Sequence, residues 1–367
     1  MKIVLLTSSL GAGGAERVAT TLCNSWVARG DEVTLIPTFS GGGEPFYSVS
    51  SQVKVIFLAD AVRTNRKGML GYVTRLFSLR ALIVEKAPDI VVSFLPNVNV
   101  AAVLSTFLMS TPLIICERSD PSTQPISWFW KVACRFFYRF ADMLTVQTAV
   151  VAAKVGSIYP GLGKVRAIPN PVPEGVAISV RKQVGLRKKM LAIGRLAPEK
   201  QVDQIISAFS CLVSDFDDWD LEIYGDGPVR PVLEAQIKKL GLQNRIFLRG
   251  RTNTPWEVMA HSDAFVMASS YEGFPNSLLE AMGIGLPCVA FDCPSGPREI
   301  SDNGEHAVLV PLNDHAALVA GLGRVMRDDF FRESLGRRAR ESVLTRFSLT
   351  AVMVGWDQLF REVGATS

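Results

Sequence analysis

The sequence lacks several features that mark whole classes of protein. Its six cysteines include no CxxC pair, which argues against a metal cluster and favours a reduced, cytoplasmic compartment. It has no low-complexity tail and no long run of like charges, and no signal peptide is expected because MKIVLLT leads directly into a glycine-rich turn. Its only histidines are His261, His306 and His315, so the first half offers no histidine base.

Acidic residues are scarce in the first half of the chain. Residues 1–170 contain 17 Lys and Arg against 10 Asp and Glu, whereas the remainder contains 22 against 25. A basic half indicates an anionic partner such as a lipid headgroup, a pyrophosphate or a nucleic acid, although a merely soluble basic surface would account for it as well. No signature of an RNA-binding module is present, so we expect no nucleic-acid partner.

One long stretch lacks charge altogether. Residues 90–116 could span a bilayer by length, but Pro96, Asn97, Asn99 and Pro112 interrupt the run. The stretch therefore predicts a buried strand, a helix and a second strand, at Ile90–Phe94, Val98–Met109 and Leu113–Cys116.

Short apolar runs alternate with helix-period segments along the chain, a pattern typical of parallel sheets covered on both faces. The three prolines of IPNPVPEG (Ile168–Gly175) indicate a linker, and the pattern restarts after it. We therefore predict an α/β protein with two tandem, doubly wound, Rossmann-like domains, residues 1–170 and 171–347. Ligands of such sheets bind beyond the carboxyl ends of the strands, and the cleft between two facing domains is the expected site.

The first motif is Gly11-x-Gly13-Gly14 after the first strand. Closely spaced glycines at a helix N-terminus let backbone amides approach a phosphate, although a tight turn without a ligand would use the same residues. Glu16 stands where the dinucleotide-binding fingerprint has a glycine, so NAD binding is not expected.

Two motifs follow strands in the second half. GRLAPEK places Arg195 and Lys200 after a strand, where two cations suit a diphosphate, although each alone is explained as surface charge. YEGFPNSLLEAMGIGLP places Glu272 in a loop and Glu280 about one turn into a helix, with Pro275 expected at the first helical position. Carboxylates accept from hydroxyl pairs, so the two would suit a molecule with hydroxyls at both ends and phosphates between them. Either glutamate alone would be an ordinary solvated acid.

These motifs resemble those of a known family. Glu272-x7-Glu280, together with GGAER, GRLAPEK, YGDGP and Ala281-x3-Gly285-x-Pro287, is similar in order and position to the family 4 retaining glycosyltransferases of the GT-B fold. The resemblance covers essentially the whole chain. ERSDP and FDCPSGPREI resemble bacterial members that build lipid-linked oligosaccharides or surface polysaccharides.

The resemblance implies a role for each residue. Arg195 and Lys200 would bind the donor diphosphate, and Glu272 would contact the donor sugar. The Phe274–Ser277 backbone, which includes Asn276, would surround the sugar and phosphates, and Glu280 would hold the ribose. Gly13 and Gly14 would face the donor phosphates from the acceptor-binding first domain, onto which a C-terminal helix within 348–367 would pack.

The chain departs from the family pattern at two places. Pro275 stands where many members have glycine, so one backbone N–H is absent. Arg118 lies at or beside the place where many members carry a histidine near the donor sugar. Arg118 would stabilise the phosphate or position the sugar, and the alternative is a structural arginine paired with Glu117 or Asp120. The departing phosphate of these retaining enzymes is thought to accept the acceptor's proton, so no enzymic base is required.

Membrane contact is expected from the basic first domain. Ile126–Phe140 interleaves aromatic residues with cations, as an interfacial helix does, although a buried helix of the domain would fit equally well. A further basic cluster comprises Arg63, Arg66, Lys67, Arg75 and Arg80.

We predict a cytoplasmic glycosyltransferase bound peripherally to the inner face of the plasma membrane. It would move a sugar from a UDP-sugar to a lipid-linked or oligosaccharide acceptor, without a metal or other cofactor, and CPSGPREI suggests an N-acetylhexosamine. Two other classes remain open. One is a GT-B sugar-nucleotide epimerase or hydrolase, and the other is a non-catalytic nucleotide-sugar-binding protein.

Overall fold

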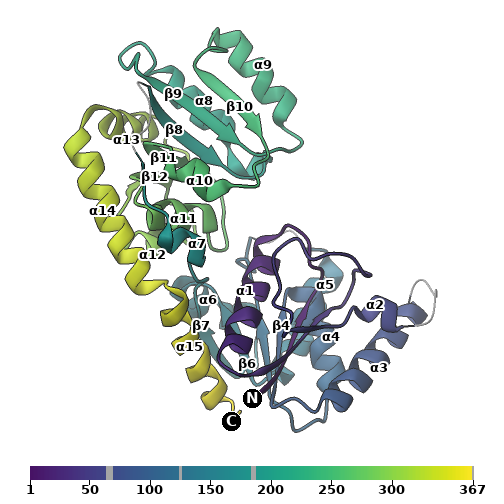
Figure 1. The fold of residues 1–367 in the computed structure, drawn as a ribbon. Helices are drawn as coiled ribbons and strands as arrows, with labels where there is room; N and C mark the ends of the chain where they lie inside the picture. The colour runs from purple at the N-terminus through teal and green to yellow at the C-terminus, as the bar shows by residue number, and fades with distance from the viewer. Residues whose placement is uncertain (63–68, 124–125, 183–186, 366–367) are drawn as a thin grey trace. The chain divides into compact units, whose positions relative to one another are not determined.

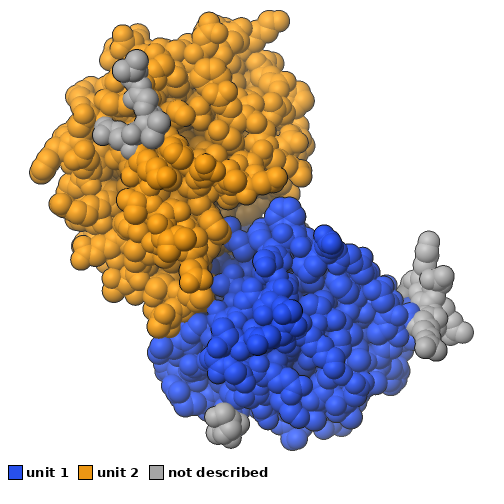
Figure 2. Space-filling model, viewed as in Figure 1, with its two compact units in different colours: residues 1–170, 352–367 blue, residues 171–351 orange. Residues whose placement is uncertain are grey.

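The computed structural model describes residues 1–62, 69–123, 126–182 and 187–365. The chain forms two compact units (Figure 2). Unit 1 comprises Met1–Asn170 and Val352–Ser367, and unit 2 comprises Pro171–Ala351. The division between Asn170 and Pro171 falls inside the proline-rich IPNPVPEG segment. Every second residue there is a proline without a backbone N–H, which disfavours a helix or a central strand.

Unit 1 is built on a seven-stranded sheet in the order β3-β2-β1-β4-β5-β6-β7, and every pairing is parallel. Its strands are β1 (Lys2–Thr7), β2 (Glu32–Pro37), β3 (Lys54–Val55), β4 (Ile90–Phe94), β5 (Leu113–Cys116), β6 (Met143–Val146) and β7 (Lys164–Ala167). Its helices are α1 (Gly14–Ala28), α2 (Leu58–Ala61), α3 (Met69–Lys86), α4 (Pro96–Thr106), α5 (Trp128–Phe137), η1 (Tyr138–Phe140) and α6 (Ala149–Ile158). Helix α15 (Leu349–Glu362) belongs to unit 1 from Val352 onward.

Alternate side chains of the unit 1 strands enter two separate cores. Ile3 and Leu5 of β1 pack with α1 and α15, whereas Val4 and Leu6 pack in the core that includes α3, α4 and α5. Figure 1 labels these helices. The last helix is held to α1 by aromatic contacts, with the rings of Trp26 and Trp356 5.8 Å apart and edge to face. A strand that is apolar on both faces is what a sheet covered by helices on both sides requires.

Unit 2 repeats the arrangement with a six-stranded parallel sheet in the order β10-β9-β8-β11-β12-β13. Its strands are β8 (Lys188–Ile193), β9 (Trp219–Tyr224), β10 (Ile246–Gly250), β11 (Ala264–Met267), β12 (Cys288–Phe291) and β13 (Val308–Val310). Its helices are α7 (Glu174–Ile178), η2 (Pro198–Lys200), α8 (Val202–Ser210), α9 (Arg230–Leu240), α10 (Pro255–Ala260), α11 (Asn276–Ile284), α12 (Pro297–Ile300), α13 (His315–Arg327) and α14 (Asp329–Arg346).

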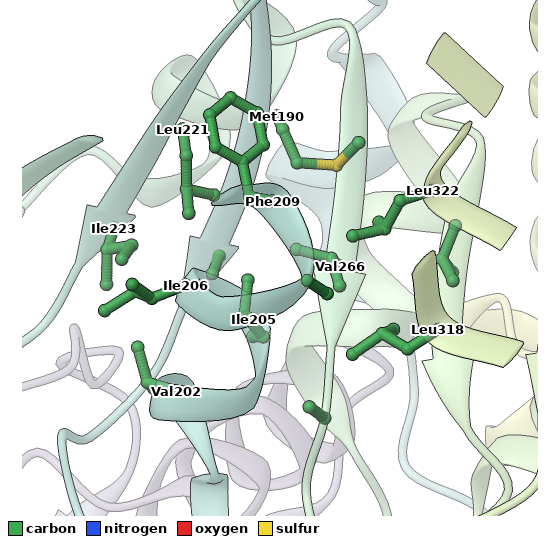
Figure 3. Packing of buried hydrophobic residues seen from close by; sticks show 14 of the residues in the cluster. Met190, Val202, Ile205, Ile206, Phe209, Leu221, Ile223, Val266, Leu318 and Leu322 are labelled. Carbon is green, nitrogen blue, oxygen red and sulfur yellow. The ribbon is translucent and has the colours of Figure 1, made fainter. Parts of the chain in front are cut away.

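Helix α8 shows why these segments are helical. Val202, Ile205, Ile206 and Phe209 recur at the i, i+3, i+4, i+7 spacing of one helix face, and all four are buried against the sheet (Figure 3). The opposite face of the sheet is covered by α11, whose buried residues share a core with Leu191 and Phe265.

The expected fold class of two doubly wound parallel sheets is confirmed, and so are the strand, helix and strand expected within residues 90–116. Among the described residues, no helix combines the length and the apolar character needed to cross a bilayer. The apolar run at Val53–Leu58 predicts a further strand, and this prediction is wrong over most of its length. Only Lys54–Val55 pair with β2, at the edge of the sheet, and Leu58 begins α2 and turns into the core.

Candidate active site

The strand order of unit 2 reverses between β8 and β11, which pair directly in the sheet. Open α/β sheets bind ligands in the crevice beyond the carboxyl ends of the strands at such a reversal. The loops that follow Ile193 and Met267 therefore lie side by side, although they are far apart in the sequence. These loops carry GRLAPEK and YEGFPNS.

The backbone of GRLAPEK is held by YGDGP, which follows β9. A Cβ on Gly225 would lie 1.8 Å from the carbonyl oxygen of Gly194, and one on Gly227 would lie 2.2 Å from that of Leu196. The Leu196 amide also donates to the Asp226 carbonyl over 3.0 Å. Only glycine permits this approach of two backbones, so YGDGP is a support for the loop that presents Arg195.

Arg195 and Glu199 form an ion pair, with Arg195 Nη2 2.5 Å from Glu199 Oε1. The Arg195 side chain is 69% exposed, so it remains accessible to a ligand. Burial alone would raise the pKa of Glu199, but a hydrogen bond from its own backbone amide and the Arg195 guanidinium outweigh this effect and lower the pKa. The Glu199 carbonyl accepts from the Ser270 amide over 2.8 Å, which links the two loops.

Lys200 and Glu272 are brought together across the reversal. Lys200 Nζ lies 2.5 Å from Glu272 Oε1, and both side chains are largely shielded from solvent. Lys200 closes η2, and the next residue, Gln201, has a φ of 45°, a left-handed conformation that is unusual for a residue other than glycine. The ammonium group therefore fixes one oxygen of the carboxylate beside the carboxyl end of β11.

A pocket lies where these loops meet, with about 340 Å³ of free space that includes open solvent. Four of the residues expected in the site line it, and they are Arg195, Lys200, Glu272 and Ser277. Ser269 also lines it, and its fully buried hydroxyl has no hydrogen-bond partner within the described structure. A buried hydroxyl of this kind is available to a ligand.

Helix α11 begins at Asn276, and its first turn reaches the pocket through Ser277. The expectation that Pro275 is the first helical residue is wrong by one position, because its ψ of 89° is not helical and Pro275 is the N-cap. Phe274 is buried and packs on Phe347, with ring centroids 5.9 Å apart, so only its backbone is available to a ligand.

Glu280 is 3% exposed and accepts a hydrogen bond from Trp256 Nε1 of α10 over 3.0 Å. It is not among the residues that line the described pocket, and neither are Phe274 and Asn276. The indole of Trp256 is held in turn by Gly175, where a Cβ would come within 2.3 Å of the ring.

The loop after β12 supports the loop that carries Glu272. Gly296 has a φ of 98°, and a Cβ there would lie 2.2 Å from Cδ of Pro275. Ser295 Oγ donates to the Gly273 carbonyl over 2.9 Å. The Pro275 ring therefore occupies the space that a side chain at position 296 would need.

Gly13 and Gly14 lie at the N-terminus of α1 in unit 1, with Gly13 as the N-cap. A Cβ on Gly13 would meet the Glu16 carboxylate at 2.0 Å, and that carboxylate accepts from Ser9 Oγ over 3.0 Å. The Glu16 carboxylate therefore supplies the negative charge that the helix dipole favours at the N-terminus of α1.

Arg118 follows β5 in unit 1 and is 8% exposed. Its guanidinium donates to Asn170 Oδ1 and lies 4.4 Å above the centre of the Phe94 ring. Neither ion pair of the structural alternative is formed within the described residues, because Glu117 accepts from Tyr138 and Asp120 binds Lys154. Burial lowers the pKa of Arg118 to about 10, so it remains a cation at neutral pH. Its Nε has no hydrogen-bond partner within the described structure.

One group in the described part of the chain has the geometry of metal ligands. Asp302, Glu305 and His306 bring ligand atoms within 4.8 Å of one another in the turn after α12. None of them lines the pocket. The six cysteines are all free, and only Cys211 is exposed.

Two family descriptions match the chain. The description of the glycosyl transferases group 1 matches residues 179–342, and that of the glycosyl transferase 4-like domain matches residues 13–171. The chain belongs to the GT-B glycosyltransferases. This confirms the resemblance of the motifs.

This glycosyltransferase is also similar to individual proteins. It is 29% identical to an exopolysaccharide phosphotransferase of Streptomyces coelicolor over 99% of this chain, although it spans only 41% of that protein's length. It is 27% identical, over 99% of both chains, to a Campylobacter jejuni enzyme named GalNAc-alpha-(1->4)-GalNAc-alpha-(1->3)-diNAcBac-PP-undecaprenol alpha-1,4-N-acetyl-D-galactosaminyltransferase. A TarM mutant of S. aureus, crystallised with fondaparinux, alpha-GlcNAc-glycerol and UDP, shares the fold with a TM-score of 0.79, 13% identity and coverage of 98% of this chain and 99% of that one.

Sequence reasoning missed Glu199, Ser269 and Trp256 of this glycosyltransferase. Glu199 stands within GRLAPEK, and its i, i+4 spacing to Arg195 was a signal that could have predicted the ion pair. Ser269 lies two residues after the end of β11, at the strand end where ligands of such sheets bind. Trp256 had no local signal, because only the packing of α10 against α11 brings it to Glu280.

Proposed function

We propose that this glycosyltransferase moves a sugar, an N-acetylhexosamine, from a UDP-sugar to a lipid-linked saccharide with retention of anomeric configuration. The acceptor would belong to the assembly of a bacterial surface polysaccharide or lipid-linked oligosaccharide. The Campylobacter relative, which matches over its full length and is named for an undecaprenol-diphosphate-linked substrate, supports this acceptor class. The UDP bound in the TarM structure supports the donor. The enzyme would act at the inner face of the plasma membrane, with unit 1 taking the acceptor.

The pocket of unit 2 would hold the donor. Arg195, which is exposed, and Lys200 would bind the diphosphate and stabilise the negative charge that develops as it leaves. The N-terminus of α11 would add its backbone amides and helix dipole to the same anion, with Asn276 and Ser277 in its first turn. Because these groups neutralise the phosphates, the proposal needs no metal ion.

The carboxylates would hold the two ends of the donor. Glu272, oriented by Lys200, would accept from hydroxyls of the sugar, and Glu280, oriented by Trp256, would accept from the ribose. Neither acts as an acid or base in this proposal. The departing phosphate oxygen would accept the proton of the acceptor hydroxyl as the glycosidic bond forms.

The ion pair of Lys200 and Glu272 is the observation that carries the proposal. It brings the cation that would bind the phosphates into contact with the carboxylate that would bind the sugar, at the strand reversal and next to a helix N-terminus. A pocket that bound only a nucleoside would not require a carboxylate beside the cation that is proposed to bind the diphosphate.

A thermal-shift screen against UDP-, GDP- and ADP-sugars tests the donor, and we expect stabilisation by UDP-sugars. Transfer is then measured with an undecaprenyl-diphosphate saccharide, and the anomeric configuration of the product is read by NMR. Donor conversion without acceptor would indicate the epimerase or hydrolase alternative. Tight donor binding without turnover on any lipid-linked saccharide would indicate a binding protein. Either result would overturn the proposal.

A further inference from the structure

Helix α5 of unit 1 has an exposed apolar face. Trp128, Val132 and Phe136 recur every four residues, and Phe140 of η1 continues the row. Their exposed fractions lie between 44% and 77%, and the neighbouring Phe129 is 65% exposed. Large apolar side chains at this spacing are normally buried in a soluble domain, so their exposure requires an explanation.

The other face of α5 is buried in unit 1. Ala133, Cys134 and Tyr138 belong to the core between the helices and the sheet, and Trp130 packs against that core. The buried helix that was one interpretation of Ile126–Phe140 is therefore present on this face, and the interfacial interpretation stays a prediction. The segment is a buried helix on one face and an exposed aromatic helix on the other, so packing within unit 1 does not account for the exposed row.

A row of cations runs beside the apolar row. Lys131, Arg135 and Arg139 are exposed and also recur every four residues. Within the described structure none of them forms an ion pair, and Arg135 and Arg139 donate to the carbonyl oxygens of Ile158 and Phe136. Trp128–Phe140 contains no acidic residue. The Arg139 guanidinium lies 4.8 Å from the centre of the Phe136 ring, so the two rows are in contact.

The apolar row extends onto the end of α4, which packs beside α5 (Figure 1). The rings of Phe107 and Phe140 lie 5.6 Å apart, and Phe136 and Phe140 are 6.2 Å apart. Leu108, the next residue after Phe107, is 87% exposed and has a φ of 62°. Arg80 of α3 anchors this turn by donating to the carbonyl oxygens of Ser105 and Phe107.

We propose that these residues form a membrane-docking face that inserts into the headgroup region of an anionic bilayer. The aromatic–basic face is defined as Phe107, Leu108, Trp128, Phe129, Lys131, Val132, Arg135, Phe136, Arg139 and Phe140. The rings and Leu108 enter the acyl boundary, and the cations bind lipid phosphates beside them. The inference rests on the proposed function, because it names the surface by which the enzyme reaches a lipid-linked acceptor.

Charge decides the occupant. A second copy of this chain would present the same three cations and no acid on the same face, so a symmetric dimer through it would bring like charges together. An anionic bilayer offers both an apolar interior for the aromatic row and phosphates for the cations. Of the basic cluster expected from the sequence, Arg75 and Arg80 lie on α3, and Arg63, Arg66 and Lys67 fall outside the described residues.

The test is flotation of the full chain with vesicles of phosphatidylcholine alone or with phosphatidylglycerol. We expect the wild type to bind the anionic vesicles at low salt and to dissociate as salt rises. Trp128→Ser/Phe136→Ser is expected to weaken binding about tenfold. Lys131→Glu is expected to weaken it at least about fivefold. The matched controls in unit 2, Phe330→Ser and Lys239→Glu, are expected to bind as the wild type does, because both positions are exposed outside this face.

A wild type that does not bind anionic vesicles at low salt would overturn the proposal, as would variants that bind equally well. A concentration-dependent dimer that Trp128→Ser/Phe136→Ser abolishes would instead make the face an interface between copies. The variants should keep the UDP-induced thermal shift and transfer to a soluble acceptor, which excludes misfolding. If the protein binds vesicles through this face but has no transferase activity, the membrane-docking proposal stands and only the proposed function is rejected.

Discussion

The ammonium group of Lys200 lies 2.5 Å from a carboxylate oxygen of Glu272, although 72 residues separate the two in the sequence. This contact joins the two motifs that mark the site, because the strands that precede them are neighbours in the sheet. The carboxylate neutralises the cation, so donor phosphates would share a cation that already orients the carboxylate proposed to bind the sugar.

Removal of Lys200 should therefore affect catalysis more than folding. Lys200→Ala is expected to lower turnover at least about tenfold, because the leaving diphosphate loses a cation and Glu272 loses its orienting partner. Arg195→Ala should lower turnover by a similar factor, whereas Lys239→Ala, an exposed lysine on α9, should not. Steady-state kinetics with saturating acceptor would check this, and wild-type kinetics in both site variants would refute the assignment.

Trp256 should act through Glu280. Trp256→Phe keeps most of the packing but removes the donor of a hydrogen bond to a carboxylate that is 3% exposed. We expect a loss of about 1.5–3 kcal/mol in the free energy of unfolding. We also expect a higher KM for the nucleotide-sugar donor, with kcat changed much less. Glu280→Ala should also raise KM chiefly. Donor titration by calorimetry measures the change, and an unchanged donor affinity in Trp256→Phe would show that the indole has no positioning role.

Pro275 and Gly296 should behave as a coupled pair. Gly296→Ala places a Cβ 2.2 Å from the Pro275 ring and forces alanine to a φ of 98°, so it should destabilise the protein and weaken donor binding. Adding Pro275→Gly removes the clash but not the backbone strain, so the double variant should recover part of the loss. A double-mutant cycle on thermal unfolding should give a coupling of about 0.5–3 kcal/mol. Simple additivity of the two changes would contradict the contact.

Glu117 should make stability depend on pH. It is fully buried, accepts from Tyr138 Oη over 2.5 Å, and burial raises its pKa from 4.5 to about 7. Because the folded protein holds this proton more tightly than the unfolded chain does, stability from this group is fully present below pH 4.5 and is lost as pH rises through 7.

Glu117→Gln stays neutral at every pH and should lack this dependence. The Tm of the wild type minus that of Glu117→Gln should therefore fall by at least about 2 °C between pH 5.5 and pH 8. Thermal unfolding followed by circular dichroism at both pH values measures it. Parallel pH profiles in the two proteins would mean that Glu117 is ionised in the folded state throughout this range.

The sequence alone determined the strand positions and the fold class. Buried parallel strands are continuous apolar runs, so β1, β4, β5, β6, β11 and β12 could be located from local pattern, whereas the edge strand β3 could not, because only two of its residues pair. Arg195, Lys200 and Glu272 were also singled out from the sequence, because they stand in the loops that follow two strands. They line one pocket together with Ser277 of the first turn of α11, and their roles stay a prediction.

Tertiary structure decided what each of these residues touches. The order of strands in a sheet is not encoded in any one segment, so the contact of Lys200 with Glu272 and that of Trp256 with Glu280 had no local signal. The same reason applies to α5. The aromatic residues of α5 and of the adjoining η1 lie on several sides of the segment. Only packing against the core determined that Tyr138 of η1 is buried while Trp128 and Phe136 of α5 face outward. Side-chain type and spacing are local properties, whereas burial depends on which elements meet.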